Sequence, residues 1–565
     1  MKKILNIAIK LLGVTLLTAC SGSTDSTNSS THSSKVVSFN NSAESFLIEG
    51  VDYIDHANTY DGKKFEYDQS MWYINNLNDV PLPDPHVFYE DGKYYITGTS
   101  DRNNEVIDIY VTEDFISYKS HLAVYDPSDF GGWESETNAD LYAPEIYNFN
   151  GVYYMYYSAQ DKDGVRRSSV VSSTNILGPY APIQNSDVDG LAAPLFNYDY
   201  NRTLDATVFV DDDGQMYMYY VVTSTTQHIV GVKMKSPYEA DWSTRVELVK
   251  PGYLNSTSML KPLTWECLRS TSTQIAEAPF MIKSNGKYYL TYSVNGCWNK
   301  YYSVCYAVSD SPLGNYEKPY KSGQTWTNLL LGYPGTNIET SKVYKQWSGF
   351  ASGTGHHCFF NIGDQIMIGY HAHQNRDFNS ESGYVKRYFA MDYLYFDKDG
   401  VPFCNGPTWS LQPLPQELSG YRNVATESEI ATQNIQNGDA LTDNYIVDCY
   451  NLAQENNKEV VLGKGSSYVE LEFDKEYTIG GIAIYNSAYY EKIITDIKYI
   501  DFGNGNAIYY PQYCVDMFVN NDNSFVFPNS AITVEFPNTF KSNKVTLCFE
   551  SNNGAQINEI KVLAY

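Results

Sequence analysis

One pattern returns five times along this 565-residue chain. A polar residue is followed by an apolar run, a polar turn and a second run of aromatic and β-branched residues, which predicts a strand that begins at a polar side chain and continues into a hairpin. The copies span residues 83–100, 142–159, 204–220, 277–293 and 355–372. They start about 60 to 80 residues apart, the length of a four-stranded blade with its loops. The repeat therefore predicts an all-β fold whose main domain is a five-bladed β-propeller.

The opening polar residues of the five copies are Asp84, Glu145, Asp205, Glu277 and His356. In a propeller the innermost strand of each blade lines the central channel, so we expect these five residues to occupy equivalent positions and to meet at one mouth of the channel. Four of them are acidic. The pattern therefore predicts a cluster of carboxyl groups at the channel mouth.

Carboxyl groups on opposite sides of such a channel suit hydrolysis of a glycosidic bond. Inversion requires a protonated acid at the leaving oxygen and a carboxylate base that activates water, roughly 6.5–9.5 Å apart. The pKa of the acid must be raised by burial or by a neighbouring carboxylate. Asp84 and Asp205 could instead cap turns. Glu277, beside Ala-Pro-Phe, has no evident structural task, which favours a functional one.

Four short motifs resemble those of glycoside hydrolase family 43, over about residues 80–415. They are Asp84-Pro85 ahead of a hairpin, Ala143-Pro144-Glu145, Leu204-Asp205 ahead of VFVDDDG, and Glu277-Ala278-Pro279. The resemblance implies a five-bladed propeller and an inverting hydrolase of plant polysaccharides or oligosaccharides. It further implies that Asp84 is the general base, that Glu277 is the general acid, and that Asp205 raises the pKa of the acid and orients it.

The resemblance extends to Gly355-His356, which is similar to the channel histidine of the family. In some members that histidine holds a hydrated calcium ion through water, so the resemblance implies a water-mediated structural calcium at His356 and no cofactor for catalysis. The chain departs from the family pattern at Tyr142, Ala206 and Ala278, where Trp, Pro and Gly are common. The carboxyl residues themselves are all present.

Further residues are candidates for contact with the substrate. Trp133 and Trp298 could stack on a sugar face, with ordinary packing as the alternative. Glu145 is expected to line the channel rather than to act as one of the three essential carboxyls. His371 and His373 alternate along a strand and share a face, so we expect them to form a stacked pair in the core.

The substrate class follows from the resemblance, which implies α-L-arabinofuranosyl or β-D-xylosyl bonds. Long inserts at residues 249–273 and 325–352 precede the fourth and fifth copies and could border one side of the site, which favours exo action. The alternatives are an endo-acting arabinanase of the same fold, a non-catalytic carbohydrate-binding lipoprotein of a glycan-uptake system, and a purely structural propeller. A binding protein has no need for Asp84, Asp205 and Glu277 together.

The N-terminus predicts export. Two lysines precede an apolar run at residues 4–17, which is too short to span a bilayer. The run ends in Leu17-Thr18-Ala19-Cys20, which resembles the bacterial lipobox and implies lipidation of Cys20; an ordinary secretory signal is the alternative. Residues 21–35 are rich in Ser, Thr and Asn and predict a flexible tether. Ser21 after the lipidated residue favours the outer membrane, on its periplasmic or cell-surface face.

Charge and cysteine content restrict the partners. The net charge of −27 argues against nucleic acid or an anionic membrane surface, so we expect a neutral glycan partner, membrane contact only through the lipid, and a monomer. None of the nine cysteines forms a CxxC pair, which argues against a zinc site. Free buried thiols and disulfides both stay open for the eight cysteines after Cys20.

The C-terminal part changes character after a proline-containing linker at residues 405–417. Residues 418–565 contain short alternating strands with turn signals, which predict a β-sandwich. Asn423-Val424-Ala425, ALTD at residues 440–443 and the closing INEIKVLAY resemble the discoidin (F5/8 type C) family, many members of which bind carbohydrate. We expect a propeller domain at residues 36–415 and a C-terminal sandwich that either buttresses the propeller or binds a glycan.

Overall fold

The computed structural model describes residues 70–75, 80–100, 105–183, 195, 202–268, 274–299, 301–332, 351–374, 386–408, 411–446, 460–487, 492, 494, 497–503, 507–509 and 531–565. They form two compact units: the first holds the described residues between 75 and 407, and the second holds residues 70–74 and those from 408 onward. The predicted signal peptide, tether and lipidated Cys20 lie outside the described residues. Within the described ranges, no helix is long and apolar enough to cross a membrane.

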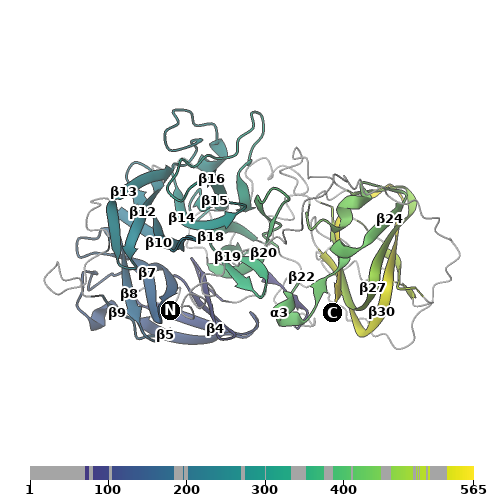
Figure 1. Cartoon of the computed structure of the whole chain (residues 1–565), viewed down its shortest axis with the longest axis horizontal. Coiled ribbons are helices and arrows are strands. Elements are labelled where there is room, and N and C mark those ends of the chain that lie inside the picture. Colours follow the sequence, from purple (N-terminus) through teal and green to yellow (C-terminus); the bar gives the residue numbers. More distant parts are fainter. Residues whose placement is uncertain are drawn as a thin grey trace. The chain divides into compact units, whose positions relative to one another are not determined.

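The first unit contains five antiparallel four-stranded sheets, each with its strands in chain order (Figure 1). Blade I comprises β2 (His86–Glu90), β3 (Lys93–Thr97), β4 (Ile107–Thr112) and β5 (Lys119–Tyr125). Blade II comprises β6 (Tyr142–Phe149), β7 (Val152–Gln160), β8 (Arg166–Ser173) and β9 (Ala181–Pro182). Blade III comprises β10 (Arg202–Val210), β11 (Met216–Thr223), β12 (Gln227–Ser236) and β13 (Glu239–Val249). Blade IV comprises β14 (Ala276–Ser284), β15 (Lys287–Val294), β16 (Ser303–Ser309) and β17 (Leu329–Gly332). Blade V comprises β18 (Ala351–Ile362), β19 (Gln365–Gln374), β20 (Arg387–Phe396) and β21 (Pro402–Cys404).

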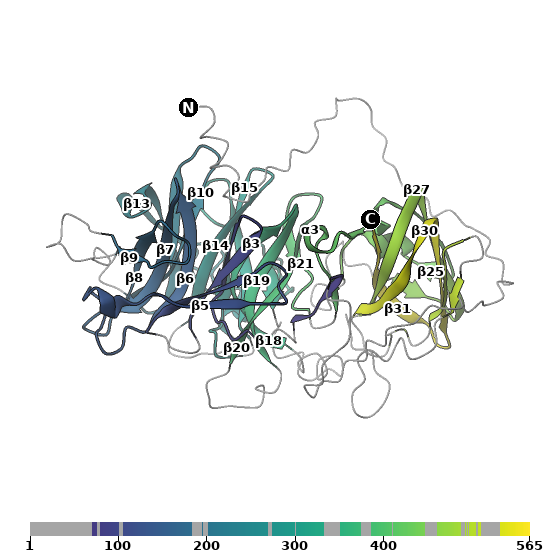
Figure 2. The ribbon, with the colours of Figure 1, turned by 90° about the horizontal axis from the view of Figure 1, so that it is seen from below.

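The innermost strands close a ring. Each inner strand contacts the next one in the order β2, β6, β10, β14 and β18, and β18 contacts β2 again. Figure 2 shows the same sheets after a turn of 90°, seen from below. This closure of five sheets on themselves confirms the predicted five-bladed β-propeller.

Short hairpins connect the first two strands of each blade, as the repeats predict. Three of these hairpins turn at a two-residue pair in which both residues have positive φ: Asp91-Gly92, Asn150-Gly151 and Asn285-Gly286. Such pairs favour Asn or Asp followed by Gly, because these residues tolerate the left-handed conformation that matches the twist of the strands. The polar turn in each repeat is therefore the local cause of the hairpin.

Every inner strand is interrupted at one place. In blade II the ladder passes from the pair Tyr142 and Ser158 to the pair Glu145 and Tyr156, so two residues of the inner strand lie opposite one residue of its partner, which is a β-bulge. The ladders of blades III, IV and V shift at the same point, and in blade I the Thr99 amide bonds to the Pro83 carbonyl there. The first bulge residues are Asp84, Ala143, Asp205, Ala278 and His356, all with φ between 46° and 56°.

This register corrects one expectation. Asp84, Asp205 and His356 are equivalent, but Glu277 precedes the equivalent position by one residue and Glu145 follows it by two. The expectation treated the opening polar residues of the five repeats as equivalent, whereas hydrogen bonds between strands decide which residues are equivalent. Because a bulge breaks the alternation of side chains along a strand, neighbouring positions such as those of Glu277 and Asp205 can point to one site.

A segment ahead of blade I joins the last blade. The Phe389 amide of β20 donates to the Val80 carbonyl at 3.0 Å, and Pro81 bridges Tyr388. The Asn75 side chain donates to the Met391 carbonyl at 2.9 Å and accepts from its amide at 3.0 Å. The chain before the first blade therefore extends the edge of the fifth blade and ties the two ends of the ring together.

The second unit is also built of strands. A short pair joins β1 (Trp72–Tyr73) to β22 (Gln412–Pro413). After α3 (Gln416–Ser419), nine strands share one hydrogen-bonded system: β23 (Arg422–Asn423), β24 (Glu429–Gln433), β25 (Ile435–Gln436), β26 (Val460–Leu462), β27 (Gly465–Asn486), β28 (Ile497–Asp501), β29 (Ala507–Tyr509), β30 (Ala531–Ser551) and β31 (Ala555–Ala564). The two long strands β27 and β30 pair along most of their length.

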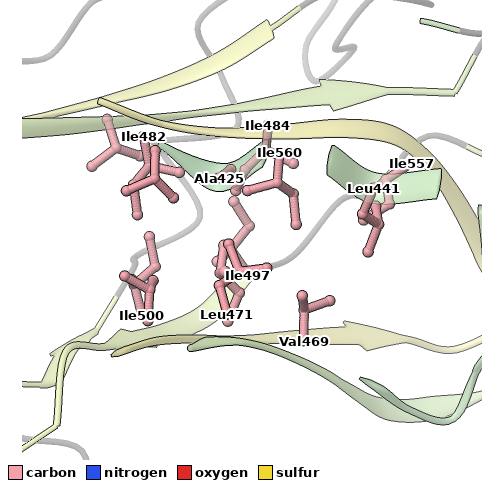
Figure 3. Close-up of a cluster of buried hydrophobic side chains, with 14 of the residues drawn as sticks. Ala425, Leu441, Val469, Leu471, Ile482, Ile484, Ile497, Ile500, Ile557 and Ile560 are labelled. Carbon is pink, nitrogen blue, oxygen red and sulfur yellow. The ribbon is translucent and has the colours of Figure 1, made fainter. Parts of the chain in front are cut away.

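The core of this unit lies between two layers of strands. Figure 3 shows Ile482, Ile484 and Ile560 on one side and Val469, Leu471 and Ile500 on the other, with their side chains directed toward each other. All six are fully buried. Such alternating inward positions on facing strands produce a continuous apolar interior.

Six cysteines of the described residues carry free thiols: Cys267, Cys297, Cys305, Cys358, Cys404 and Cys548. Cys449 and Cys514 lie outside the described residues. Of the two alternatives left open by the sequence, these six cysteines follow the free-thiol one, and Cys305, Cys358 and Cys548 are buried.

Candidate active site

Asp84, the first bulge residue of blade I, is surrounded by hydrogen-bond donors and positive charge. Arg387 Nη1 lies 2.8 Å from Oδ1, His356 Nδ1 lies 3.1 Å from the same oxygen, and Thr99 Oγ1 donates to Oδ2 at 2.6 Å. Burial alone would raise the pKa of Asp84, but the charges of Arg387 and His356 hold it well below its ordinary value. Asp84 is therefore a buried carboxylate that is ionised at neutral pH.

His371 contacts Asp84 from blade V. Its Nδ1 accepts a hydrogen bond from the Asp84 amide at 3.2 Å and lies 3.4 Å from Oδ1. Burial lowers the pKa of His371 to about 3, so the ring is neutral with its proton on Nε2. The ring stacks on Tyr302, with centroids 5.4 Å apart, and on His373, with centroids 6.5 Å apart. The expected stacked pair is present, but His371 also belongs to the surroundings of Asp84.

Glu277, in blade IV, has the opposite electrostatic character. Burial raises its pKa, the neighbouring Asp205 raises it further, and His356 and the Tyr302 hydroxyl offset part of this, so the pKa is about 7. Asp205 Oδ2 accepts a hydrogen bond from the amide of Ala278, the residue after Glu277, at 3.0 Å. Burial and Asp84 raise the pKa of Asp205, while His356 and the Ala278 amide lower it. Near neutral pH, Glu277 retains a proton that Asp84 has lost.

This difference is what general acid–base chemistry requires. A protonated carboxyl can donate to a leaving oxygen, and an ionised carboxylate can take a proton from water. Asp84, Asp205 and Glu277 are each more than nine-tenths buried, so their charges act through a medium of low polarity. The structure thus brings the three predicted carboxyls into one electrostatic cluster, from three different blades.

His356 lies at the centre of this cluster. Burial would lower its pKa, but Asp84 and Asp205 raise it to about 9, so the imidazolium form is stable at neutral pH. The positive ring is paired with Asp84, with Nδ1 3.1 Å from Oδ1. In the described part of the chain, no group of three or more His, Cys, Asp or Glu residues could hold a metal. The calcium ion that the resemblance implies would be held through water, and it stays a prediction.

Glu145 lies two residues beyond the bulge of blade II. Its Oε2 accepts a hydrogen bond from the Tyr147 hydroxyl, which also lies 2.9 Å from Thr207 Oγ1. Burial raises the pKa of Glu145 to about 7 although the bond from Tyr147 opposes this. Glu145 is a fourth buried carboxyl of the inner strands, and it does not occupy the first bulge position that Asp84 and Asp205 hold.

The two predicted tryptophans differ in exposure. Trp133 packs against Tyr157, with ring centroids 6.3 Å apart, in the hydrophobic cluster between blades I and II. This arrangement corresponds to the packing alternative. Trp298 is 53% exposed, and the residue before it, Cys297, accepts a hydrogen bond from His373 at 2.8 Å. Trp298 thus presents an open ring next to the cluster, as a sugar platform requires.

Three residues of the site, Arg387, Thr99 and Tyr302, were not singled out in the sequence, and His371 was expected only as a core residue. Arg387 gives no local signal, because a lone arginine on a strand is ordinary. Thr99 and His371 occupy the same place in their repeats, opposite the residue before the bulge, and an alignment of the second strands could have revealed them. Tyr302 comes from the segment ahead of β16 and becomes a neighbour of Glu277 only in the folded chain.

A five-bladed propeller whose channel holds an ionised and a protonated carboxyl group defines a glycosidase, an enzyme that hydrolyses glycosyl bonds. Residues 74–402 match the family described as Glycosyl hydrolases family 43. The chain belongs to this family.

Two relatives and one solved structure illustrate the similarity. Xylosidase/arabinosidase 43A of Humicola insolens is 30% identical over 290 residues, covering 44% of this chain and 81% of the relative. An extracellular exo-alpha-(1->5)-L-arabinofuranosidase of Streptomyces chartreusis is 22% identical over 314 residues, covering 52% and 80%. The crystal structure of a thermostable family-43 glycoside hydrolase is 28% identical and covers 61% of this chain and 99% of its own, with a TM-score of 0.48.

Proposed function

We propose that this chain is an inverting glycosidase in which Asp84 is the general base, Glu277 is the general acid and Asp205 raises the pKa of the acid and orients it. The observation that carries the proposal is the opposite displacement of two pKa values. That of Asp84 lies well below its ordinary range, and that of Glu277 is about 7. Two carboxyls whose pKa values are displaced in opposite directions can act as base and acid in one step.

The reaction then proceeds in one displacement. Asp84 takes a proton from a water molecule as the oxygen of that water attacks the anomeric carbon. The bond to the leaving oxygen breaks, and Glu277 transfers its proton to that oxygen, so that the sugar is released with inverted configuration. The imidazolium of His356 and the guanidinium of Arg387 keep Asp84 ionised until the water is deprotonated.

The proposed substrates are plant oligosaccharides or polysaccharides with terminal α-L-arabinofuranosyl or β-D-xylosyl groups. The name of the relative from Humicola insolens includes both activities, and the name of the relative from Streptomyces chartreusis states exo action on arabinofuranosyl bonds. The insert at residues 249–273 favours a bordered site. An endo-acting arabinanase is the alternative, and the product sizes from a linear oligosaccharide distinguish the two: monosaccharide alone supports exo action, and mixed oligomers support endo action.

The deciding experiment compares wild type with Glu277→Ala on aryl pentosides and hexosides. We expect wild type to cleave one class of pentoside, and the variant to lose activity on substrates with poor leaving groups while retaining much of it on activated aryl glycosides. Proton NMR of the first product formed should show inverted configuration. A wild type that binds but cleaves none of the panel, nor any arabinan or xylan oligomer, would support the non-catalytic alternative. Retained configuration would exclude the proposed roles of the two carboxyls.

We further propose that the enzyme is exported and anchored by a lipid on Cys20, in the outer membrane, as a monomer. The support is the lipobox-like sequence and the polar stretch that follows it. The second unit is proposed to be a β-sandwich similar to the discoidin family, with a supporting role or a glycan-binding role. Its two layers of strands around a common core are consistent with a sandwich. Metabolic labelling with a fatty acid, in wild type and Cys20→Ala, tests the anchor.

A further inference from the structure

A ring of hydrogen bonds links each blade of the propeller to the next at the bulges. At four of the five junctions, the amide of the first bulge residue donates to a side chain of the preceding blade. In that preceding blade, the accepting residue pairs with the residue just before the bulge. The donors and acceptors are Ala143 to Thr99 at 3.0 Å, Asp205 to Ser158 at 3.1 Å, His356 to Ser293 at 2.9 Å, and Asp84 to His371 at 3.2 Å. The ladder positions of these acceptors are equivalent.

The junction from blade III to blade IV breaks this rule. The equivalent position in blade III is Val221, which pairs with Leu204. Its side chain has no group that can accept a hydrogen bond. The amide of Ala278 donates to Asp205 Oδ2 instead, at 3.0 Å. A buried amide without a partner costs free energy, so an acceptor is required at this place. The carboxylate of Asp205 supplies it.

Blade I shows what happens when the acceptor is present. Asp84 is the equivalent of Asp205, and its own blade carries Thr99 at the position of Val221. Thr99 Oγ1 accepts from the Ala143 amide and donates to Asp84 Oδ2 at 2.6 Å. The hydroxyl therefore lies between the aspartate and the next blade, and Asp84 has its other oxygen next to Arg387 and His356.

We propose that Val221 is a positioning residue for Asp205: because position 221 lacks a hydroxyl, Asp205 bonds directly to the backbone of blade IV, beside Glu277. A threonine at this position would hold Asp205 on blade III, as Thr99 holds Asp84 on blade I. The residue that pairs with the position just before the bulge thus assigns different neighbours to two aspartates in equivalent positions. This inference rests on the proposed roles of Asp205 and Glu277.

The expected consequence is a change in the proton affinity of Glu277. Asp205 is the neighbouring charge that most raises the pKa of Glu277, so moving its carboxylate back onto blade III lowers that pKa. The other groups that act on these two carboxyls stay in place: Asp84, His356 and Tyr302 for Glu277, and Asp84, His356 and Arg166 for Asp205. Glu277 then loses its proton at lower pH.

The test is Val221→Thr, which is close to isosteric, compared with Val221→Ala. In Val221→Thr, the basic limb of the pH profile of kcat/KM should move to lower pH by about one unit. Activity at neutral pH should fall more on poor leaving groups than on activated ones. Val221→Ala offers no hydroxyl and should keep the basic limb of the wild type. Val230→Thr, a fully buried valine on the neighbouring strand β12, is the control for placing a hydroxyl in the interior.

A folded Val221→Thr variant with the basic limb of the wild type would overturn the inference. If this variant does not fold, Thr99→Val provides the reciprocal test. Without the hydroxyl, the Ala143 amide should draw Asp84 away from His356 and Arg387, so the pKa of Asp84 rises and the acid limb of the kcat/KM profile moves to higher pH. An unchanged acid limb would overturn the inference.

A readout that does not depend on activity separates this inference from the proposed function. In a double-mutant cycle of Val221→Thr and Asp205→Asn, measured by unfolding, the effect of Asp205→Asn should differ between the two backgrounds, because Asp205 has a different partner in each. Additive effects would overturn the inference even if the enzyme cleaves its substrate. A clear coupling in a protein that cleaves no glycoside would leave the positioning intact and exclude the proposed reaction.

Discussion

Arg387 Nη1 lies 2.8 Å from Asp84 Oδ1, although 303 residues separate them along the chain. Asp84 lies two residues before β2, the inner strand of blade I, and Arg387 is the first residue of β20, the third strand of blade V. Only the closed ring of blades brings them together. The contact has a chemical consequence, because a guanidinium beside a buried carboxylate stabilises the charged form that a general base needs.

Replacing Arg387 with methionine should therefore weaken the proposed base. Without the guanidinium, the pKa of Asp84 should rise by about one to two units, so the acid limb of the kcat/KM profile moves to higher pH. Arg387→Lys keeps the positive charge and should show a smaller shift. The measurement is a pH profile on an activated aryl glycoside. An acid limb that stays at the wild-type position in Arg387→Met would show that the guanidinium does not control Asp84.

The basic limb should report Glu277. Its pKa of about 7 means that the protonated form predominates below pH 7 and is lost as the pH rises through that value. Activity should therefore decline above about pH 7, and Glu277→Gln should abolish this limb on activated substrates. A wild-type profile that stays flat to pH 9 would exclude Glu277 as the acid.

Glu145 serves as an internal comparison, because burial raises its pKa to about 7 as well. It accepts a hydrogen bond from Tyr147 and lies away from the bulge positions. A general acid contributes about 10²–10⁴-fold, so Glu277→Gln should lose activity on that scale on poor leaving groups, while Glu145→Gln should lose less than about tenfold and keep the basic limb. The reverse result would assign the acid to Glu145.

The stability of the propeller should depend on a buried ion pair at the insert ahead of blade IV. Lys318 Nζ lies 2.5 Å from Glu266 Oε2, and both side chains are almost fully buried. Glu266 also accepts hydrogen bonds from the Gly252 amide and the Tyr292 hydroxyl. Lys318→Met leaves a buried carboxylate without its cation, so the free energy of unfolding should fall by about 3–5 kcal/mol.

Urea unfolding, followed in the transition of the propeller, measures this loss. The matched control is Lys287→Met, which removes an exposed partner of Asp310 and should change the free energy by less than about 0.5 kcal/mol. Equal effects of the two substitutions would show that the buried pair does not hold the insert.

Calcium should not be required. Asp84 and Glu277 need no metal to act as base and acid, and the imidazolium of His356 already supplies a positive charge next to Asp84. Dialysis against EDTA should leave kcat/KM and Tm unchanged, and added calcium should not restore or increase either. A loss of activity that calcium reverses would mean that a cation binds near His356 and that the ring is neutral.

The fold was predictable from the chain because its signals are local and repeated. The signals are the apolar alternation, the turn pairs such as Asp91-Gly92 and the regular spacing of the five copies. Alternation and turn pairs depend only on neighbouring residues, and they recur along the chain. The three carboxyls of the site were predictable for the same reason, since each stands at the start of its copy. The expectation of equivalent positions failed for Glu145 and Glu277, because charge is visible in a sequence and ladder register is not.

The amino-acid order alone was enough for the five-bladed architecture and for the identity of the acidic residues Asp84, Asp205 and Glu277. Only the tertiary structure decided which of them is ionised and which is protonated. A pKa depends on burial and on charges a few ångströms away, and here those charges come from other blades, as with Arg387 and His356 beside Asp84. Likewise, we infer that the partner of Asp205 depends on whether the residue paired with Leu204, just before the bulge, carries a hydroxyl, a relationship that exists only after the strands have paired.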